Sequence, residues 1–332
     1  MPYKVGLDAI RKAATHLVII TDDCVASLYG EKLKRYLQEG KRVDLVTFPP
    51  GERSKTRETK ARIEDELFSL GLGRDGALIA LGGGVVTDLT GFIAATYCRG
   101  IPYLSIPTTL LGMVDASIGG KTGVNLPGGK NMIGAFYPPV EVIIDTGFLK
   151  SLGEDELRSG MAEVIKYGAI WDAALFNELH NFQGWHPLIK KSISIKEEIV
   201  KRDPLEKGLR HILNFGHTIG HAIETLENYS LSHGEAVAIG MIGEAYLTRQ
   251  EAPLIKIIEK LGFPLKISPN VTAKALFEVM KKDKKAQNKV ARFVQLEEIG
   301  KALSFNGHYC NKVADEHLLH TLNWMIHWIN SR

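Results

Sequence analysis

Hydrophobic residues in the first half of the chain recur in short runs separated by stretches of mixed polarity. The runs are HLVIITD at 16–22, RVDLVTF at 42–48, GALIALGGG at 76–84, PYLSIPTTL at 102–110 and VEVIID at 140–145. Such runs, bounded by turn residues, are typical of buried strands, and helical patterns lie between them. This alternation predicts an α/β domain over residues 1–149, with a Rossmann-like, mostly parallel sheet.

The pattern changes after residue 150. Apolar residues then recur at intervals of three and four in the segments 153–170, 187–203, 218–228 and 235–250, which is helical spacing. At 332 residues the chain is long enough for two domains. We therefore expect a predominantly α-helical second domain over 150–332, with the boundary near Leu149 to Gly153.

Composition excludes several classes of protein. With 45% hydrophobic and 24% charged residues the chain has a globular composition, and a net charge of +3 is too small to predict a nucleic-acid or membrane-surface partner. Cys24, Cys98 and Cys310 are odd in number and widely separated, which favours neither a disulfide framework nor a cysteine metal site. There is no export signal or long apolar run. We expect a cytoplasmic protein.

Glycines mark the end of one predicted strand. Gly82, Gly83 and Gly84 stand where the strand gives way to a helix, and the free N–H groups of a helix N-terminus favour phosphate. The pattern is not a strict G-x-G-x-x-G, so a plain turn is the alternative to a dinucleotide site.

A second glycine-rich segment follows the next predicted strand. Thr108 and Thr109 stand at the strand end, and two glycine pairs further on are each followed by a lysine, Lys121 and Lys130. Glycines expose backbone amides and lysines add positive charge, so this loop suits phosphate or carboxylate recognition. A mobile surface loop is the alternative.

Three histidines lie close together in the second half. His217 and His221 are four residues apart on a predicted helix, and His233 follows. Catalytic zinc sites take three protein ligands, and two histidines with a carboxylate are a common set. Spacing alone favours His217 and His221 as joint ligands, but Thr218 replaces the glutamate of an H-E-x-x-H metalloprotease. The carboxylate stays open among Glu163, Glu224, Glu227 and Glu235.

Five stretches resemble the 3-dehydroquinate synthase family, in the family's order and spacing. They read GGGVVTDLTGFIAATYCRGI, IPTTLLGMVDASIGGKTGVNLPGGKN, GMAEVIKYG, LRHILNFGHTIGHAIE and SHGEAVAIGM. The likeness spans nearly the whole chain. It implies an active site in the cleft between the two domains, NAD and Zn²⁺ (or Co²⁺) as cofactors, and a homodimer.

The resemblance also implies individual roles. It assigns the metal to Glu163, His217 and His233, contrary to the spacing argument for His221. Thr87 and Ser151 replace a glycine and a threonine that are usual in the family. The implied NAD contacts are Asp22 (or Asp23), Glu52, Lys55, Gly83, Gly84, Asp88, Thr108, Thr109, Asp115, Lys121, Lys130 and Ser151.

The family's substrate is a sugar phosphate, 3-deoxy-D-arabino-heptulosonate 7-phosphate, which carries a phosphate and a carboxylate. By resemblance, Arg99 reaches the site of a neighbouring subunit, and His221 and Lys166 relay protons. The remaining contacts implied are Lys121, Asn131 and Lys284 (or Lys285) to the phosphate, Lys196 and Arg210 to the carboxylate, and Lys130, Lys166 and Asn214 around the pocket.

The implied reaction is a transient oxidation by NAD, loss of phosphate, return of the hydride, ring opening and an intramolecular aldol closure. Three other functions fit parts of the pattern. They are a metal-dependent polyol dehydrogenase, a sugar-phosphate cyclase whose substrate lacks the carboxylate, and a non-catalytic nucleotide-binding or zinc-sensing protein. Lys196 and Arg210 argue against the second.

Overall fold

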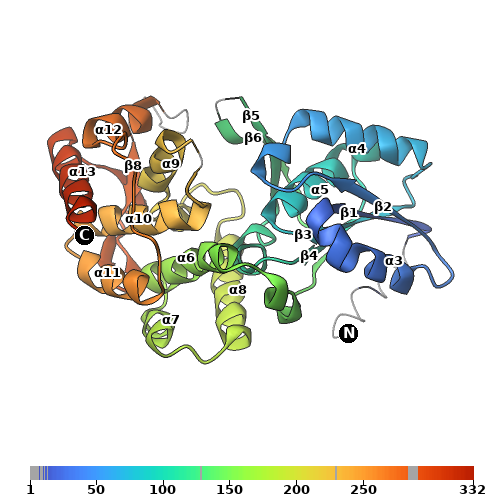
Figure 1. The fold of residues 1–332 in the computed structure, drawn as a ribbon, viewed down its shortest axis with the longest axis horizontal. Coiled ribbons are helices and arrows are strands. Elements are labelled where there is room, and N and C mark those ends of the chain that lie inside the picture. The colour runs from blue at the N-terminus through green and yellow to red at the C-terminus, as the bar shows by residue number, and fades with distance from the viewer. Residues whose placement is uncertain are drawn as a thin grey trace. The chain divides into compact units, whose positions relative to one another are not determined.

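The computed structural model describes residues 14–127, 129–228, 230–282 and 291–332, together with Leu7, Ile10 and Lys12. The chain forms two compact units, which divide between Leu152 and Gly153. Figure 1 shows a sheet flanked by helices in the first unit and a collection of helices in the second.

The first unit is built on a five-stranded sheet in the order β2-β1-β3-β4-β7. Every neighbouring pair is parallel. All residues of β3 and all but the last of β1 are buried, which is typical of a parallel sheet covered on both faces. The strands are β1 (His16–Asp22), β2 (Arg42–Phe48), β3 (Ala77–Gly82), β4 (Tyr103–Pro107) and β7 (Glu141–Val142).

The predicted parallel sheet is therefore confirmed, with one shortened member. The run at 140–145 contributes only the two residues of β7, which pair with Leu104 and Ser105 at the sheet edge. The helices of this unit are α2 (Asp23–Val25), α3 (Glu31–Leu37), α4 (Arg57–Ser69) and α5 (Gly84–Thr96), and the short helical turns are η1 (Ala26–Gly30), η2 (Glu52–Ser54), η3 (Tyr97–Arg99), η4 (Gly112–Ala116) and η5 (Thr146–Ser151).

The segment read as a glycine-rich loop is in part a β-hairpin. Strands β5 (Lys121–Leu126) and β6 (Gly129–Phe136) pair antiparallel, with Gly123 opposite Gly134. The expectation of a loop there was wrong, because glycine in a strand also permits close approach of the paired backbone: a Cβ on Gly123 would lie 2.5 Å from the Ile133 carbonyl oxygen.

The second unit is mainly helical, as predicted. Its helices are α6 (Glu154–Ile170), α7 (Ala173–Glu178), α8 (Trp185–Arg202), α9 (His217–Leu226), α10 (His233–Tyr246), α11 (Glu251–Lys260), α12 (Ala273–Lys282) and α13 (Asp315–Asn330), with short turns η6 (Leu179–Asn181) and η7 (Leu209–Asn214). Two small antiparallel pairs join β8 (Arg292–Val294) to β11 (Cys310–Lys312) and β9 (Leu296–Glu298) to β10 (Lys301–Ala302).

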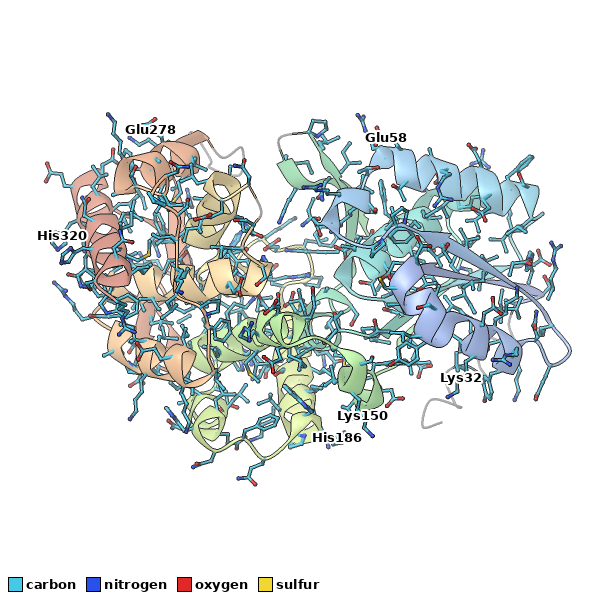
Figure 2. The ribbon with its side chains drawn as sticks, viewed as in Figure 1. Lys32, Glu58, Lys150, His186, Glu278 and His320 are labelled. Atoms are coloured by element: carbon cyan, nitrogen blue, oxygen red, sulfur yellow. The ribbon has the colours of Figure 1, made fainter. Side chains whose placement is uncertain are left out.

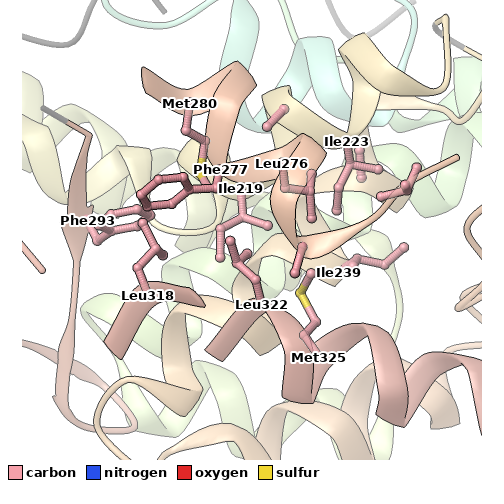
Figure 3. Packing of buried hydrophobic residues seen from close by; sticks show 14 of the residues in the cluster. Ile219, Ile223, Ile239, Leu276, Phe277, Met280, Phe293, Leu318, Leu322 and Met325 are labelled. Atoms are coloured by element: carbon pink, nitrogen blue, oxygen red, sulfur yellow. The ribbon is translucent and has the colours of Figure 1, made fainter. Parts of the chain in front are cut away.

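Helices α9, α10, α12 and α13 share one apolar core. Ile219 and Ile239 meet Leu276, Leu322 and Met325 in this cluster, as Figure 3 shows. Polar side chains lie on the outer faces of two of these helices: Glu278 on α12 and His320 on α13 are exposed and point away from the core in Figure 2. This core fixes α9 and α10, which both carry histidines of interest, against each other.

Membrane-spanning helices are not found in the described residues. None of the helices there combines the length and the apolar character needed to cross a bilayer.

Candidate active site

The glycine turn lies at the switch point of the sheet. Strand β3 ends at Gly82, and Gly83 and Gly84 open helix α5. The sheet order places β2 on one side of β1 and β3 on the other, and ligands of doubly wound sheets bind at the strand ends beside this reversal. Within the described chain no side chain caps α5, so its first N–H groups suit a phosphate.

Two neighbouring strand ends add polar groups to this turn. The Thr108 amide donates to the Gly82 carbonyl at 3.0 Å, and Thr109 Oγ1 accepts from the Gly112 amide at 3.0 Å. Asp22 ends β1, the strand next to β3, and its Oδ1 accepts from the Val25 amide at 2.9 Å. Asp22, Thr108 and the glycines therefore all lie at the carboxyl-terminal ends of neighbouring strands.

Lys55 joins two other predicted residues. It is 4% exposed, and its Nζ lies 2.5 Å from Asp88 Oδ2 and 2.6 Å from Asn131 Oδ1. The ammonium group is therefore engaged by the protein itself. Asn131, expected at the substrate phosphate, accepts this bond from the hairpin.

Sequence reasoning missed Asn125, which connects these groups. Its Nδ2 donates to Glu52 Oε1 at 2.8 Å, and its Oδ1 accepts from the Asn131 amide at 2.8 Å. Its own amide donates to the Lys55 carbonyl at 2.8 Å. The sequence signal for this role was the position of Asn125, a polar residue inside a strand pattern and shortly before the glycine pair at 128–129.

The remaining predicted residues of the first unit occupy varied places. Ser151 Oγ donates to the Phe148 carbonyl at 3.0 Å and lies 2.6 Å from Tyr29 Oη, and Thr87 Oγ1 donates to the Gly84 carbonyl within α5. Arg99 is exposed and follows Cys98, and both have positive φ, 70° and 51°. Lys121 is exposed and Lys130 half-buried on the hairpin, and Asp115 lies in η4.

Three predicted ligands converge in the second unit. Glu163 comes from α6, while His217 and His233 are the first residues of α9 and α10. Glu163 Oε1 lies 3.4 Å from His217 Nε2 and 3.6 Å from His233 Nε2. One ligand atom from each lies within 4.8 Å of the others.

Close helix contacts bring these residues together. A Cβ on Gly234 would lie 2.3 Å from Ser159 Cα of α6, and one on Gly240 would lie 2.0 Å from the Gly216 carbonyl oxygen at the start of α9. Only glycine permits α10 to approach both partners this closely. The motif SHGEAVAIGM therefore sets the distance between His233 and the other two ligands.

The carboxyl group of Glu163 is held in its ionised form, which favours binding of a cation. Burial alone would raise its pKa, but the charges of Lys166 and His217 outweigh burial and hold the pKa of this carboxyl well below its usual range. Oε2 pairs with Lys166 Nζ, whereas Oε1 is buried and has no hydrogen-bond partner among the described residues. An orphaned buried carboxylate oxygen facing two imidazoles fits a divalent metal.

The two histidines differ electrostatically. Burial lowers the pKa of His217, and the nearby Lys166 charge lowers it further; its Nδ1 lies 3.1 Å from the Phe215 carbonyl oxygen. Burial also disfavours charge on His233, but the carboxylates of Glu163 and Glu224 outweigh this and raise its pKa to about 9. A metal must therefore displace a proton from His233 near neutral pH.

The other carboxylates considered as ligands fall into two groups. Glu224 is near His221 and His233, and these three form a second set with ligand atoms within 4.8 Å. Glu235 completes the capping box of α10 with Ser232, and Glu227 accepts from the Ser268 amide at 2.6 Å. His217 and His221 do not share a set, so the spacing argument for joint ligands is not supported.

The predicted carboxylate-binding residues are also buried. Arg210 is 1% exposed and Lys196 5%. Arg210 Nη1 donates to the Pro204 carbonyl at 2.8 Å. Asn214 Nδ2 donates to Glu206 Oε1 at 3.3 Å. Lys284 and Lys285 lie outside the described residues.

Asp203, which sequence reasoning missed, shapes the loop before Arg210. Its carboxylate accepts from the amides of Lys207, Gly208 and Arg210 at 2.9, 2.7 and 3.0 Å. Burial would raise the pKa of Asp203, but these three N–H donors lower it overall. Asp-Pro followed by a glycine is a turn signal that was available in the sequence.

Solved structures with similar folds include two sugar-phosphate cyclases. A 2-deoxy-scyllo-inosose synthase complexed with carbaglucose-6-phosphate, NAD⁺ and Co²⁺ has a TM-score of 0.86 and 25% identity, covering 96% of this chain and 95% of that one. A 2-epi-5-epi-valiolone synthase from Streptomyces hygroscopicus, with NAD⁺ and Zn²⁺ bound, has a TM-score of 0.88 and 29% identity, covering 98% and 94%.

Sequence comparison is more specific. Family models for the N-terminal and C-terminal parts of 3-dehydroquinate synthase match residues 45–159 and 160–286. The chain is 47% identical over 308 residues to 3-dehydroquinate synthase from Synechococcus sp., covering 85% of this chain and 83% of the relative. It is 46% identical over 306 residues to that of Acidithiobacillus ferrooxidans, covering 86% and 84%. The chain therefore belongs to the 3-dehydroquinate synthase family.

Proposed function

We propose that this chain converts 3-deoxy-D-arabino-heptulosonate 7-phosphate into 3-dehydroquinate and phosphate. The observation that carries the proposal is the convergence of Glu163, His217 and His233 in a chain about half identical to enzymes of that name. The chemistry requires one carboxylate and two neutral imidazoles around a divalent cation, and these residues supply them once the metal has displaced the proton of His233.

The proposed cofactors are NAD and Zn²⁺ or Co²⁺. The two cyclases with NAD⁺ and a divalent metal bound support this choice, as do the orphaned Glu163 Oε1 and the uncapped N-terminus of α5. In this proposal residues 1–149 bind NAD and contribute Lys121, Lys130 and Asn131 to the substrate, and residues 150–332 bind the metal and the rest of the substrate. When bound, NAD would supply hydride transfer, and a metal held by Glu163, His217 and His233 would supply a Lewis acid for the hydroxyl groups of the substrate.

The chain's own residues hold both ends of the substrate. Buried Lys196 and Arg210 bind the carboxylate, because ammonium and guanidinium groups form strong charge-assisted hydrogen bonds with such an anion. Lys121, Asn131 and Lys284 bind the phosphate, and Lys130 and Asn214 complete the pocket. Orientation of this kind lowers the entropic cost of ring closure.

Proton transfer falls to His221 and Lys166 in this proposal. His221 shares a set with His233 rather than with the Glu163 and His217 pair, so it can exchange protons without giving up the metal. The Lys166 ammonium contacts Glu163 and can donate to an oxygen that gains charge.

Two further features belong to the proposal. Arg99 is exposed on a backbone with positive φ, and strain of this kind collects at functional positions; we propose that it completes the site of a second copy in a homodimer. A cytoplasmic location is consistent with the cysteine usage and with soluble substrates.

Phosphate release from the heptulosonate phosphate tests the function. Purified protein with NAD is expected to release phosphate, and a chelator should stop the reaction until Zn²⁺ or Co²⁺ is restored. NADH should not accumulate, because the hydride returns to the substrate.

Other outcomes would support the rival functions. Steady NADH production from a polyol would favour a dehydrogenase. Glycerol dehydrogenase from Schizosaccharomyces pombe has a fold similar to that of this chain, with a TM-score of 0.64 at 15% identity. Turnover of a heptulose phosphate without a carboxylate would favour another cyclase. NAD binding without any turnover would favour a non-catalytic role.

A further inference from the structure

A buried carboxylate in the second unit stands between two histidines. Glu224 of α9 is 2% exposed. Its Oε1 lies 3.5 Å from His233 Nδ1, and its Oε2 lies 4.0 Å from His221 Nε2. Each oxygen of one carboxylate therefore faces a different imidazole, and a buried carboxylate is retained only where charged or polar partners compensate it.

The contact with His233 is on the side of the ring away from the proposed metal. His233 Nε2 faces Glu163 Oε1 at 3.6 Å, while Nδ1 faces Glu224. A neutral imidazole can present a lone pair at Nε2 only if its proton resides on Nδ1. A negative charge beside Nδ1 favours that tautomer and limits rotation of the ring.

His217 has the same arrangement with a different partner. Its Nε2 faces Glu163 Oε1, and its Nδ1 lies 3.1 Å from the Phe215 carbonyl oxygen. Both proposed histidine ligands thus have an oxygen at Nδ1. For His217 the oxygen belongs to the backbone, so mutation cannot remove it, whereas for His233 it belongs to a replaceable side chain.

We infer that Glu224 is a positioning residue that holds His233 Nε2 toward the metal and links His233 to His221. The inference rests on the proposed function for the identity of the metal site. Through Oε2, Glu224 also places His221, the proposed proton carrier, beside the ligand set. Loss of Glu224 would therefore affect metal affinity first and proton transfer second.

A competing interpretation makes Glu224 itself a ligand. His221, Glu224 and His233 have ligand atoms within 4.8 Å of one another, so a second cation has a possible site. That site would use His233 Nδ1 while Nε2 serves the first cation, which requires an imidazole stripped of both protons. The positioning role requires no such ionisation, and the two interpretations predict different numbers of bound ions.

Titration of the apo protein with Co²⁺, against a competing chelator, separates them. We expect wild type to bind one Co²⁺ per chain, and Glu224→Gln to bind one Co²⁺ about 10- to 100-fold more weakly, with shifted visible absorption bands. Glu224→Ala should be weaker again, because glutamine still offers an oxygen to Nδ1. The matched control is Glu227→Gln at the C-cap of α9, where the carboxylate accepts from the Ser268 amide. Its Co²⁺ affinity should change less than about twofold.

Circular dichroism and thermal unfolding of each variant verify that it is folded. Unchanged Co²⁺ affinity and spectrum in both Glu224 variants would overturn the inference. Two Co²⁺ per wild-type chain, with one lost in Glu224→Ala, would also overturn it in favour of a ligand role. If Co²⁺ binding depends on Glu224 but wild type releases no phosphate from the heptulosonate phosphate, the proposed function fails while the positioning role stands.

Discussion

Glu163 and Lys166 lie one turn apart on α6 and form an ion pair in which both side chains are almost fully buried, at 1% and 2% exposure. The pair keeps Glu163 ionised inside a helical core, where a lone carboxylate would take up a proton. It also leaves Oε1 directed at His217 and His233. Lys166 thus keeps the carboxylate of Glu163 negatively charged at the proposed metal site.

Replacing Lys166 with methionine should destabilise the metal-free protein. A buried ion pair that loses one partner typically costs about 3–5 kcal/mol, because the remaining charge is uncompensated. Urea denaturation of the apo protein measures this loss, and Lys166→Arg, which keeps the charge, should lose less. Saturating Zn²⁺ should restore part of the stability of Lys166→Met, since the metal binds only the folded state. Equal stability of wild type and Lys166→Met would contradict the role of this pair.

The two histidines on α9 should respond differently to alanine. His217→Ala is expected to reduce bound zinc far below one per chain, since it removes a member of the Glu163 set. His221→Ala should keep zinc near one per chain and slow phosphate release by about 10²- to 10⁴-fold, the usual contribution of a proton-transfer group. Metal analysis of the dialysed proteins, together with turnover, tests both. Loss of zinc from His221→Ala would mean that the helical spacing argument was right after all.

Much of the fold could be predicted from local patterns. Residues 16–22 form strand β1 and residues 77–82 form strand β3, and their nearly continuous apolar runs are typical of strands that are covered on both faces of a parallel sheet. The hairpin of β5 and β6 was missed, since Gly123 and Gly134 look like turn residues until their cross-strand pairing is known. Local composition cannot supply that pairing.

The site depended on packing as well as on pattern. The four-residue spacing on one helix predicts that His217 and His221 act together. In the structure, the packing of α9 against α6 and α10 places His217 beside Glu163 and His233 instead. The glycines that allow this contact are visible in the sequence, but their partners are not. Only resemblance to a family predicted the grouping of Glu163, His217 and His233, whose ligand atoms lie within 4.8 Å of one another. Asn125 was missed because its contact with Glu52 also links separate segments.

The buried carboxyl group of Glu244, on α10, should make the free energy of unfolding depend on pH. Glu244 is fully buried, and its Oε1 accepts from the amides of Thr218 and Ile219 at 3.1 and 3.5 Å. Burial raises its pKa to about 8, although backbone N–H groups oppose the shift. Between the unfolded value near 4.5 and the folded value near 8, only the folded state holds this proton. The contribution of protonated Glu244 to the free energy of unfolding is therefore complete below about pH 4.5 and is lost as the pH rises to about 8.

Glu244→Gln removes this titration and gives the test. From about pH 5 to pH 8 the unfolding free energy of wild type should fall relative to that of the variant by up to about 1.4 kcal/mol per pH unit. Urea denaturation of both proteins at unit steps of pH measures the difference. A constant difference across this range would show that Glu244 does not titrate there.

The side chain of Asn125 links the hairpin of β5 and β6 to the turn that contains Glu52 through a hydrogen bond. Asn125→Ala removes the bonds to Glu52 and to the Asn131 amide, so Lys55 and Asn131 lose a fixed spacing. NAD affinity should fall about 10-fold, equivalent to about 1.4 kcal/mol, the scale of one or two lost hydrogen bonds. Isothermal titration with NAD measures this.

Two comparisons separate a specific effect of Asn125 from general loosening of the hairpin. Thr122→Val removes a hairpin bond to the Ala135 carbonyl without touching the Glu52 turn, so its NAD affinity should stay within about twofold of wild type. Co²⁺ affinity should be unchanged in both variants, since Glu163, His217 and His233 belong to the other compact unit. An equal loss of NAD affinity in the two variants would assign the effect to the hairpin as a whole, and no loss in Asn125→Ala would remove the residue from the nucleotide site.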